Sequence, residues 1–162
     1  MGSLNKFISE YTSLLKEGKI QLAYKGIITF MFGLRTYLEK KHEGYDTSGI
    51  YQGYMDMTYF AFTPEELKSM RLKVAVVYLH KEARFELWLA AVNRQLQAEF
   101  VEIFSKMNIG RFLLSRAEPG VDAIISEIIV ENPDFDNEDG LKSTIEIAAI
   151  KFIEDVKELL KK

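Results

Sequence analysis

The chain lacks cysteine altogether, and it has only two histidines and one tryptophan among 162 residues. Without cysteine there can be no disulfide bond, no thiolate nucleophile and no cysteine-ligated zinc site. The histidines, His42 and His80, fall on different expected elements, and neither has a second histidine at helical spacing. The sequence therefore predicts no metal site, and no cofactor is expected.

Long apolar runs and a strong excess of one charge are also missing. The longest nearly apolar run, residues 26–34, has nine residues, whereas a membrane-spanning helix needs about 20. The net charge of −3 gives no electrostatic reason to expect nucleic acid or an anionic membrane as a partner. With 48% hydrophobic and 28% charged residues, the composition is typical of a soluble globular protein. We expect residues 1–162 to form a single domain in the cytoplasm.

Several catalytic signatures are absent as well. The sequence has no Gly-x-x-x-x-Gly-Lys-Ser/Thr loop, no Gly-x-Gly-x-x-Gly motif and no Gly-x-Ser-x-Gly elbow. A metal-dependent nuclease of the Asp…Glu-x-Lys type would need a lysine two residues after Glu86, where the chain has Trp88. The sequence thus identifies no catalytic residue, and it leaves open whether the protein is an enzyme.

Apolar periodicity predicts an α+β fold. Helices are expected near residues 4–15, 19–42, 64–70, 94–107 and 138–160, and strands near residues 55–62, 73–80 and 84–90. Residues 121–130 fit a helical period but are rich in β-branched side chains, so they are assigned to a strand with a helix as the alternative. This order indicates a single-layer antiparallel sheet of three to four strands, packed against four or five helices. Thr63 and Pro64 have the form of a capping box with proline at the first helical position.

The second expected helix is apolar nearly all round between residues 27 and 34, because Phe30 and Phe32 point away from its main apolar stripe. A helix without a polar face is buried on more than one side. Either the core of the protein encloses it, or a second subunit covers it. The second case predicts a homo-oligomer through the apolar helix around Phe30 and Phe32.

Residues 84–89 alternate strictly between apolar and other side chains. A strand there places Arg84, Glu86 and Trp88 on one face of the sheet and three apolar side chains on the other. With a two-residue turn at residues 81–82, position 79 lies opposite Arg84 and position 75 opposite Trp88. In a binding site, Arg84 would hold an anionic group, Glu86 would orient the arginine, and Trp88 would pack against an apolar or planar group. In the alternative interpretation, Arg84 and Glu86 form only an ion pair and Trp88 fills the core.

Two neighbouring segments add further candidate binding residues. Asn93 and Arg94 lie at a predicted helix N-terminus, where free backbone N–H groups beside an arginine can bind an anion. The loop of residues 44–54 is rich in glycine and tyrosine, and it ends at Tyr54 just before Asp56. Such a loop can contact a ligand, although its rings can equally well cover the core.

At the level of whole segments, MDMTYFAFTPEEL (residues 55–67) and RFELWLAAVNRQ (residues 84–95) resemble parts of a family of small uncharacterised microbial proteins of unknown function. The resemblance covers most of the chain. It implies a single domain of prokaryotic, cytoplasmic origin, and it implies no activity.

Three functional hypotheses follow. The first is a non-enzymatic ligand-binding or protein-interaction module that self-associates. The second is a small enzyme acting on an anionic metabolite, with Arg84 and Arg94 as anion binders and Glu86 or Asp56 as general base. The third is an accessory partner in a nucleic-acid or toxin–antitoxin system, which the acidic charge of the chain disfavours.

Overall fold

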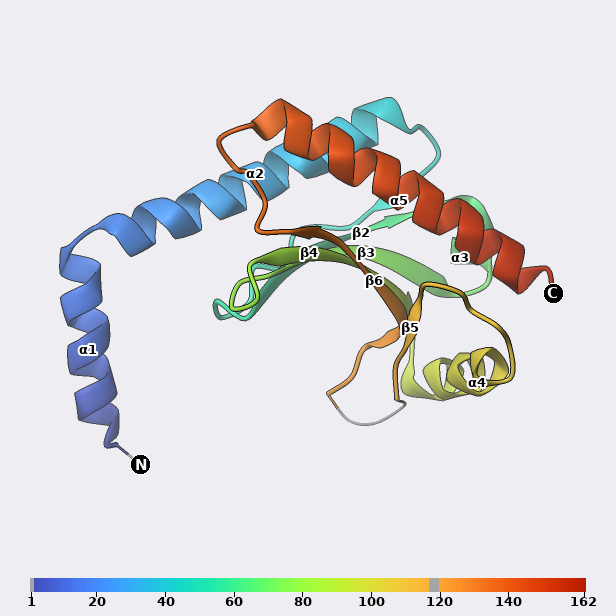
Figure 1. Ribbon diagram of the computed structural model, residues 1–162, viewed down its shortest axis with the longest axis horizontal. Helices are drawn as coiled ribbons and strands as arrows, with labels where there is room; N and C mark the ends of the chain where they lie inside the picture. The colour runs from blue at the N-terminus through green and yellow to red at the C-terminus, as the bar shows by residue number, and fades with distance from the viewer. Residues whose placement is uncertain (1, 117–119) are drawn as a thin grey trace.

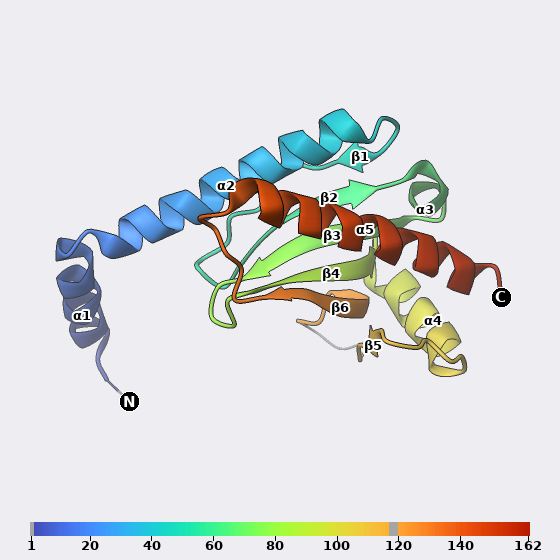
Figure 2. The same ribbon diagram turned by 45° about the horizontal axis from the view of Figure 1, so that its top comes forward.

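The structure is a computed structural model that describes residues 2–116 and 120–162. One sheet forms its centre, with helices on both sides (Figures 1 and 2). The helices are α1 (Leu4–Lys16), α2 (Lys19–Lys41), α3 (Glu65–Ser69), α4 (Arg94–Ser105) and α5 (Glu138–Leu160). The strands are β1 (Asp46–Thr47), β2 (Met57–Thr63), β3 (Leu72–Leu79), β4 (Arg84–Ala91), β5 (Leu113–Leu114) and β6 (Ala123–Glu131).

All pairings in the sheet are antiparallel, and the strand order is β1-β2-β3-β4-β6-β5. The predicted α+β class with one antiparallel sheet is confirmed, and so is the strand at residues 121–130. The predicted number of three to four strands is wrong, because the described sheet has six. The two missed strands, β1 and β5, have two residues each, which is too short to show an alternating pattern.

The two faces of the sheet differ in what covers them. Helices α2 and α5 lie side by side over one face, whereas α4 lies on the opposite side near one end of the strands (Figures 1 and 2). Paired residues Phe60, Val76 and Leu87 form a fully buried row on the face beneath α2 and α5. We call the opposite face, which carries Trp88, the open face.

The β3–β4 hairpin has the predicted register. Leu79 pairs with Arg84, and Ala75 pairs with Trp88. The chain reverses through residues 80–83, where Ala83 takes a left-handed φ of +54°. Arg84, Glu86 and Trp88 therefore lie on the same face, as the alternation of the sequence predicts.

Side-chain caps define several helix starts. Ser3 accepts a hydrogen bond from the backbone N–H of Lys6, and Asn93 accepts one from Leu96. The predicted capping box at Thr63 is wrong: the N-cap of α3 is Pro64, without a side-chain cap hydrogen bond. The Thr63 hydroxyl instead accepts from the backbone N–H of Val74. Thr63 ends a strand, so its side chain contacts the neighbouring strand and not the helix.

Gly53 lies in the loop before β2, and its backbone excludes a larger residue. Its φ is +71°, and an added Cβ would overlap the carbonyl oxygen of Met57. Gly49, in the same loop, has no atom within 4 Å of such a Cβ and no left-handed φ. A side chain at Gly53 would therefore destabilise the folded protein more than a side chain at Gly49.

We expect Gly53→Ala to lower the free energy of unfolding by about 1–3 kcal/mol, because an L-residue is strained there and its Cβ meets backbone. Gly49→Ala, the matched control, should change it by less than about 0.5 kcal/mol. Urea denaturation measures both. Equal stability of the two variants would contradict this account of the loop.

Candidate functional site

A pocket of about 590 Å³ opens on the open face, beside the N-terminus of α4. It is lined by Ser48, Gly49, Tyr51, Tyr59, Ala61, Lys73, Ala75, Trp88, Ala90, Ala91, Val92, Asn93, Arg94, Gln97 and Asp122. We call it the open-face pocket. Its lining comes from β2, β3, β4, the start of α4 and the loop before β2, so the fold brings distant segments together here.

Small side chains make the hollow. Ala61 pairs with Ala75, and Ala75 pairs with Trp88, so two alanines lie in a row beside the indole ring. Ala90 lies two residues further along the strand of Trp88 and also lines the pocket. Since alternate residues of a strand share one face, these alanines leave a depression that larger side chains would fill. We call Ala61, Ala75 and Ala90 the alanine floor.

Glu86 fixes the position of Trp88. Its carboxylate accepts a hydrogen bond from the Arg84 guanidinium (Nε to Oε2, 2.7 Å) and another from the Trp88 indole N–H (Nε1 to Oε1, 2.8 Å). Glu86 is only 6% exposed, and neither it nor Arg84 lines the pocket. The three side chains do converge, but only Trp88 reaches the pocket. Because its N–H is already bound to Glu86, Trp88 contributes its apolar ring atoms to the pocket lining.

The start of α4 forms one wall. Asn93 uses its side-chain oxygen to cap the helix. The guanidinium of Arg94 donates to the side chain of Gln97 and to the backbone carbonyl of Val121, and it forms an ion pair with Asp122 at 3.2 Å. Arg94 thus joins α4 to the start of β6, and its charge is partly neutralised within the chain.

Tyr54 and Asp56 lie outside the pocket. Tyr54 is 94% exposed, and its backbone N–H donates to the Asp56 carboxylate. Hydrogen bonds from the backbone N–H groups of Met57 and Tyr54 hold the pKa of Asp56 below its ordinary value. A general base working near neutral pH needs the opposite shift. Of the seven predicted site residues, only Trp88, Asn93 and Arg94 line the pocket.

Lys73 and Tyr59 line the pocket but were not among the predicted site residues. Lys73 is exposed and forms no ion pair with any side chain in residues 2–116 and 120–162. Burial raises the pKa of the Tyr59 hydroxyl. The alternation of β3 already places Lys73 on the face of Trp88, so the sequence contained this signal. The position of Tyr59 depends on the pairing of β2 with β3, which the sequence does not specify.

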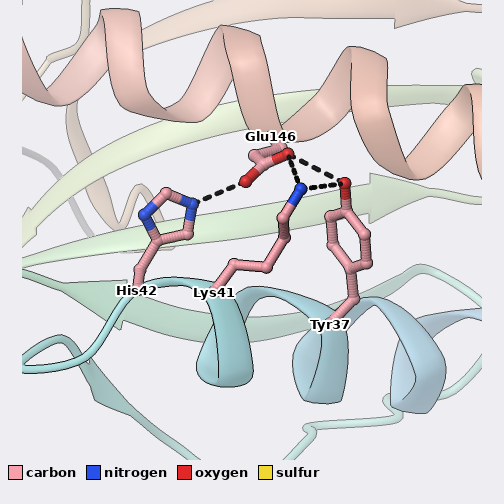
Figure 3. Close-up of polar contacts among 4 residues, drawn as sticks. All are labelled: Tyr37, Lys41, His42 and Glu146. Atoms are coloured by element: carbon pink, nitrogen blue, oxygen red, sulfur yellow. Dashed lines mark hydrogen bonds and ion pairs between the residues drawn. The ribbon is translucent and has the colours of Figure 1, made fainter.

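A second polar cluster joins α2 to α5 on the other side of the sheet (Figure 3). Glu146 accepts hydrogen bonds from Tyr37 (2.8 Å) and from the Nε2 of His42 (2.7 Å), and Lys41 lies 3.4 Å from the same carboxylate. We call these four residues the Glu146 cluster. Tyr45 and Phe62 pack against the His42 ring. None of the four lines the open-face pocket, and their contacts hold α2 against α5.

Within residues 2–116 and 120–162, no group of three His, Asp or Glu side chains is placed to hold a metal ion. No helix in the same ranges is long and apolar enough to cross a membrane. The sequence-based expectations of no metal, no cofactor and a cytoplasmic location stay predictions.

Comparison with known proteins places the chain in a family. Residues 4–160 match the family described as a domain of unknown function, DUF7000. The chain belongs to this family. The sequence-based resemblance to an uncharacterised family is thereby confirmed, and DUF7000 membership assigns no activity. No curated protein and no solved structure matches the chain, so any function must be argued from the geometry of its sites.

The Glu146 cluster generates a pH-dependent prediction. Burial opposes ionisation of Glu146, but hydrogen bonds from His42 and Tyr37, together with Lys41, outweigh it and hold the pKa of Glu146 below its ordinary value of 4.5. A carboxylate whose pKa is depressed by folding stabilises the folded protein at pH values above its ordinary pKa. This stabilisation is lost as the pH falls through the folded-state pKa. Glu146→Gln should therefore lower the free energy of unfolding by about 1–3 kcal/mol near pH 7. The difference from the unsubstituted protein should shrink below about pH 4.

Urea denaturation at several pH values measures this effect. Glu158→Gln is the matched control on α5, since the ion pair of Glu158 with Lys161 is exposed and should contribute less than about 0.5 kcal/mol. A loss of stability for Glu146→Gln that is the same at pH 3 and pH 7 would show that its charge is not what stabilises the helix pair.

Proposed function

We propose that this protein is a non-enzymatic binding module that holds a small, planar, anionic molecule in the open-face pocket. The observation that carries the proposal is the juxtaposition of Trp88, the alanine floor and Lys73 in one hollow. A volume of about 590 Å³ falls within the range of roughly 300–1,000 Å³ that is typical of small-molecule sites.

The lining supports a planar ligand. Tyr51, Tyr59 and Trp88 supply aromatic surface around a floor of alanines. Aromatic rings favour stacked or edge-on contact with other planar groups. Because Glu86 accepts the Trp88 N–H at 2.8 Å, the indole is held in one orientation, and a fixed ring costs less entropy on binding than a mobile one.

The charges support an anionic group on that ligand. Lys73 lines the pocket and has no ion-pair partner among the described residues, so its ammonium group is available to a carboxylate or phosphate. The N-terminus of α4 begins at the pocket wall, and the partial positive charge of a helix N-terminus favours an anion. Asp122 offsets Arg94, so Lys73 carries the proposed anion contact.

The alternative of a small enzyme has less support from the geometry. Glu86, its best candidate base, is bound by Arg84 and Trp88 and does not line the pocket. Asp56, the other candidate, has a lowered pKa and also lies elsewhere. Arg84 and Arg94, the proposed anion binders, are each paired to a carboxylate.

Titration with 2-naphthoate, a planar aromatic carboxylate, tests the proposal. We expect a saturable shift of the indole N–H resonance in nitrogen-15 NMR, and the assignment is unambiguous because the chain has one tryptophan. Ala75→Leu should weaken binding at least about 10-fold by filling the floor. Lys73→Gln should weaken it about 3-fold, since one exposed charge pair contributes less than 1 kcal/mol.

Matched controls separate the pocket from general surface effects. Ala98 is exposed on α4 and does not line the pocket, so Ala98→Leu should bind 2-naphthoate as the unsubstituted protein does. Lys40, an exposed lysine near the end of α2, provides the same control through Lys40→Gln. Unchanged binding by Ala75→Leu, or no shift of the Trp88 resonance at millimolar ligand, would refute the proposal.

A further inference from the structure

Helix α1 carries an apolar stripe that the chain itself does not cover. None of its 13 residues is buried. Five large apolar side chains at helical spacing are about half exposed or more: Leu4 (71%), Phe7 (51%), Ile8 (49%), Tyr11 (56%) and Leu14 (51%). In both ribbon views α1 extends away from the sheet and diverges from α2 (Figures 1 and 2). Helices this short are marginal in water and depend on packing of an amphipathic face.

A groove on α2 provides a second uncovered apolar surface. It has a volume of about 710 Å³ and lies between the first half of α2, the end of β3 and the turn before α5. Leu22, Ile27, Phe30 and Phe135 contribute its apolar lining, and Leu22 is 73% exposed. We call it the α2 groove.

The two side chains of the predicted oligomer contact, Phe30 and Phe32, differ in exposure. Phe30 is 4% exposed and packs against Phe85 and Phe135 within the chain. Phe32 is 49% exposed and does not line the α2 groove. The uncovered surfaces of α1 and of the α2 groove therefore do not include Phe32, and an oligomer contact through Phe32 stays a prediction.

We propose that two copies of this chain form a two-fold symmetric dimer in which α1 of each copy lies in the α2 groove of the other. Both halves of the contact are present on one chain, which is what a symmetric interface requires. An amphipathic helix docking through side chains at i, i+3, i+4 and i+7 is a common way of filling an apolar groove. The proposal goes beyond ligand binding and does not depend on the open-face pocket.

Area supports a second copy as the occupant. Helix α1 carries Lys6 and Lys16 against Glu10, and the groove has Asp136, Lys25 and Glu138, the last paired with Lys142 at 2.9 Å, so no excess of like charge opposes contact between two copies. The five stripe side chains of α1 and Leu22 of the groove are about half exposed or more. If each loses about 100 Å² of accessible surface on docking, roughly half of a large side chain, one chain loses about 600 Å² and two chains together bury about 1,200 Å². That area reaches the lower limit of specific interfaces.

A lipid surface is disfavoured by the same charges. Helices that lie on anionic membranes are rich in Lys and Arg on their polar face. The polar face of α1 is mainly Ser, Thr and Asn, with two lysines and one glutamate.

Disulfide cross-linking tests the geometry directly, because the chain has no cysteine of its own. A tagged Tyr11→Cys chain is mixed with an untagged Leu22→Cys chain under mild oxidation. Cross-links between a Tyr11→Cys chain and a Leu22→Cys chain are expected to exceed cross-links between two chains of the same variant at least about 10-fold. Ser13→Cys, on the polar face of α1, is the matched control and should not cross-link to Leu22→Cys.

Sedimentation velocity tests the association itself. The unsubstituted protein should be dimeric at tens of micromolar, and Phe7→Glu with Tyr11→Glu should weaken dimerisation about 100-fold, as expected for the loss of two buried anchors. Ser13→Glu should have no effect. Circular dichroism verifies that each variant stays folded, which the exposure of these side chains leads us to expect.

Three outcomes would overturn the proposal. A strict monomer at tens of micromolar removes the dimer. Predominant cross-linking of Tyr11→Cys to itself replaces the groove by an α1–α1 contact. Flotation of a monomeric protein with phosphatidylserine vesicles identifies α1 as a membrane-surface helix. None of these results bears on 2-naphthoate binding, so the two proposals fail independently.

Discussion

The alternation of side chains along β3 and β4 is the constraint on which the rest of the structure depends. Phe85, Leu87 and Leu89 point to α2 and α5 and are fully buried, while the residues between them point to the opposite face. A slip of one residue in the hairpin would exchange the two sets. The apolar set drives the folding of the sheet against the helices, and the intervening set is thereby presented together on the open face.

The open face combines polar and apolar side chains in a defined order. Glu86 is nearly buried there, but two hydrogen bonds satisfy its carboxylate, so its burial does not leave an uncompensated charge. Arg84 and Glu86 form an ion pair, as the structural interpretation of the Arg84, Glu86 and Trp88 group holds, and Trp88 lines the open-face pocket. Binding of an anion by Arg84 stays a prediction.

Much of the fold could be predicted from local patterns. The long helices α2 and α5, the β3–β4 register and the Asn93 cap all follow from periodicity or capping preferences. The sites could not be predicted in this way, because they depend on contacts between residues far apart in the sequence. Tyr37 and Glu146 hydrogen-bond across 109 sequence positions, and Arg94 reaches Asp122 across 28. No local pattern specifies such pairs, because tertiary packing alone brings them together.

The alanine floor has a consequence for how such a protein can diversify. Ala61 and Ala75 alternate along their strands with core residues such as Phe60 and Val76, yet they face a hollow and contribute little to the packing beneath α2 and α5. Substitutions at these positions can change the shape of the pocket while the core keeps its composition. The proposed ligand specificity and the stability of the core can therefore vary independently, because alternate residues of the same strands determine them.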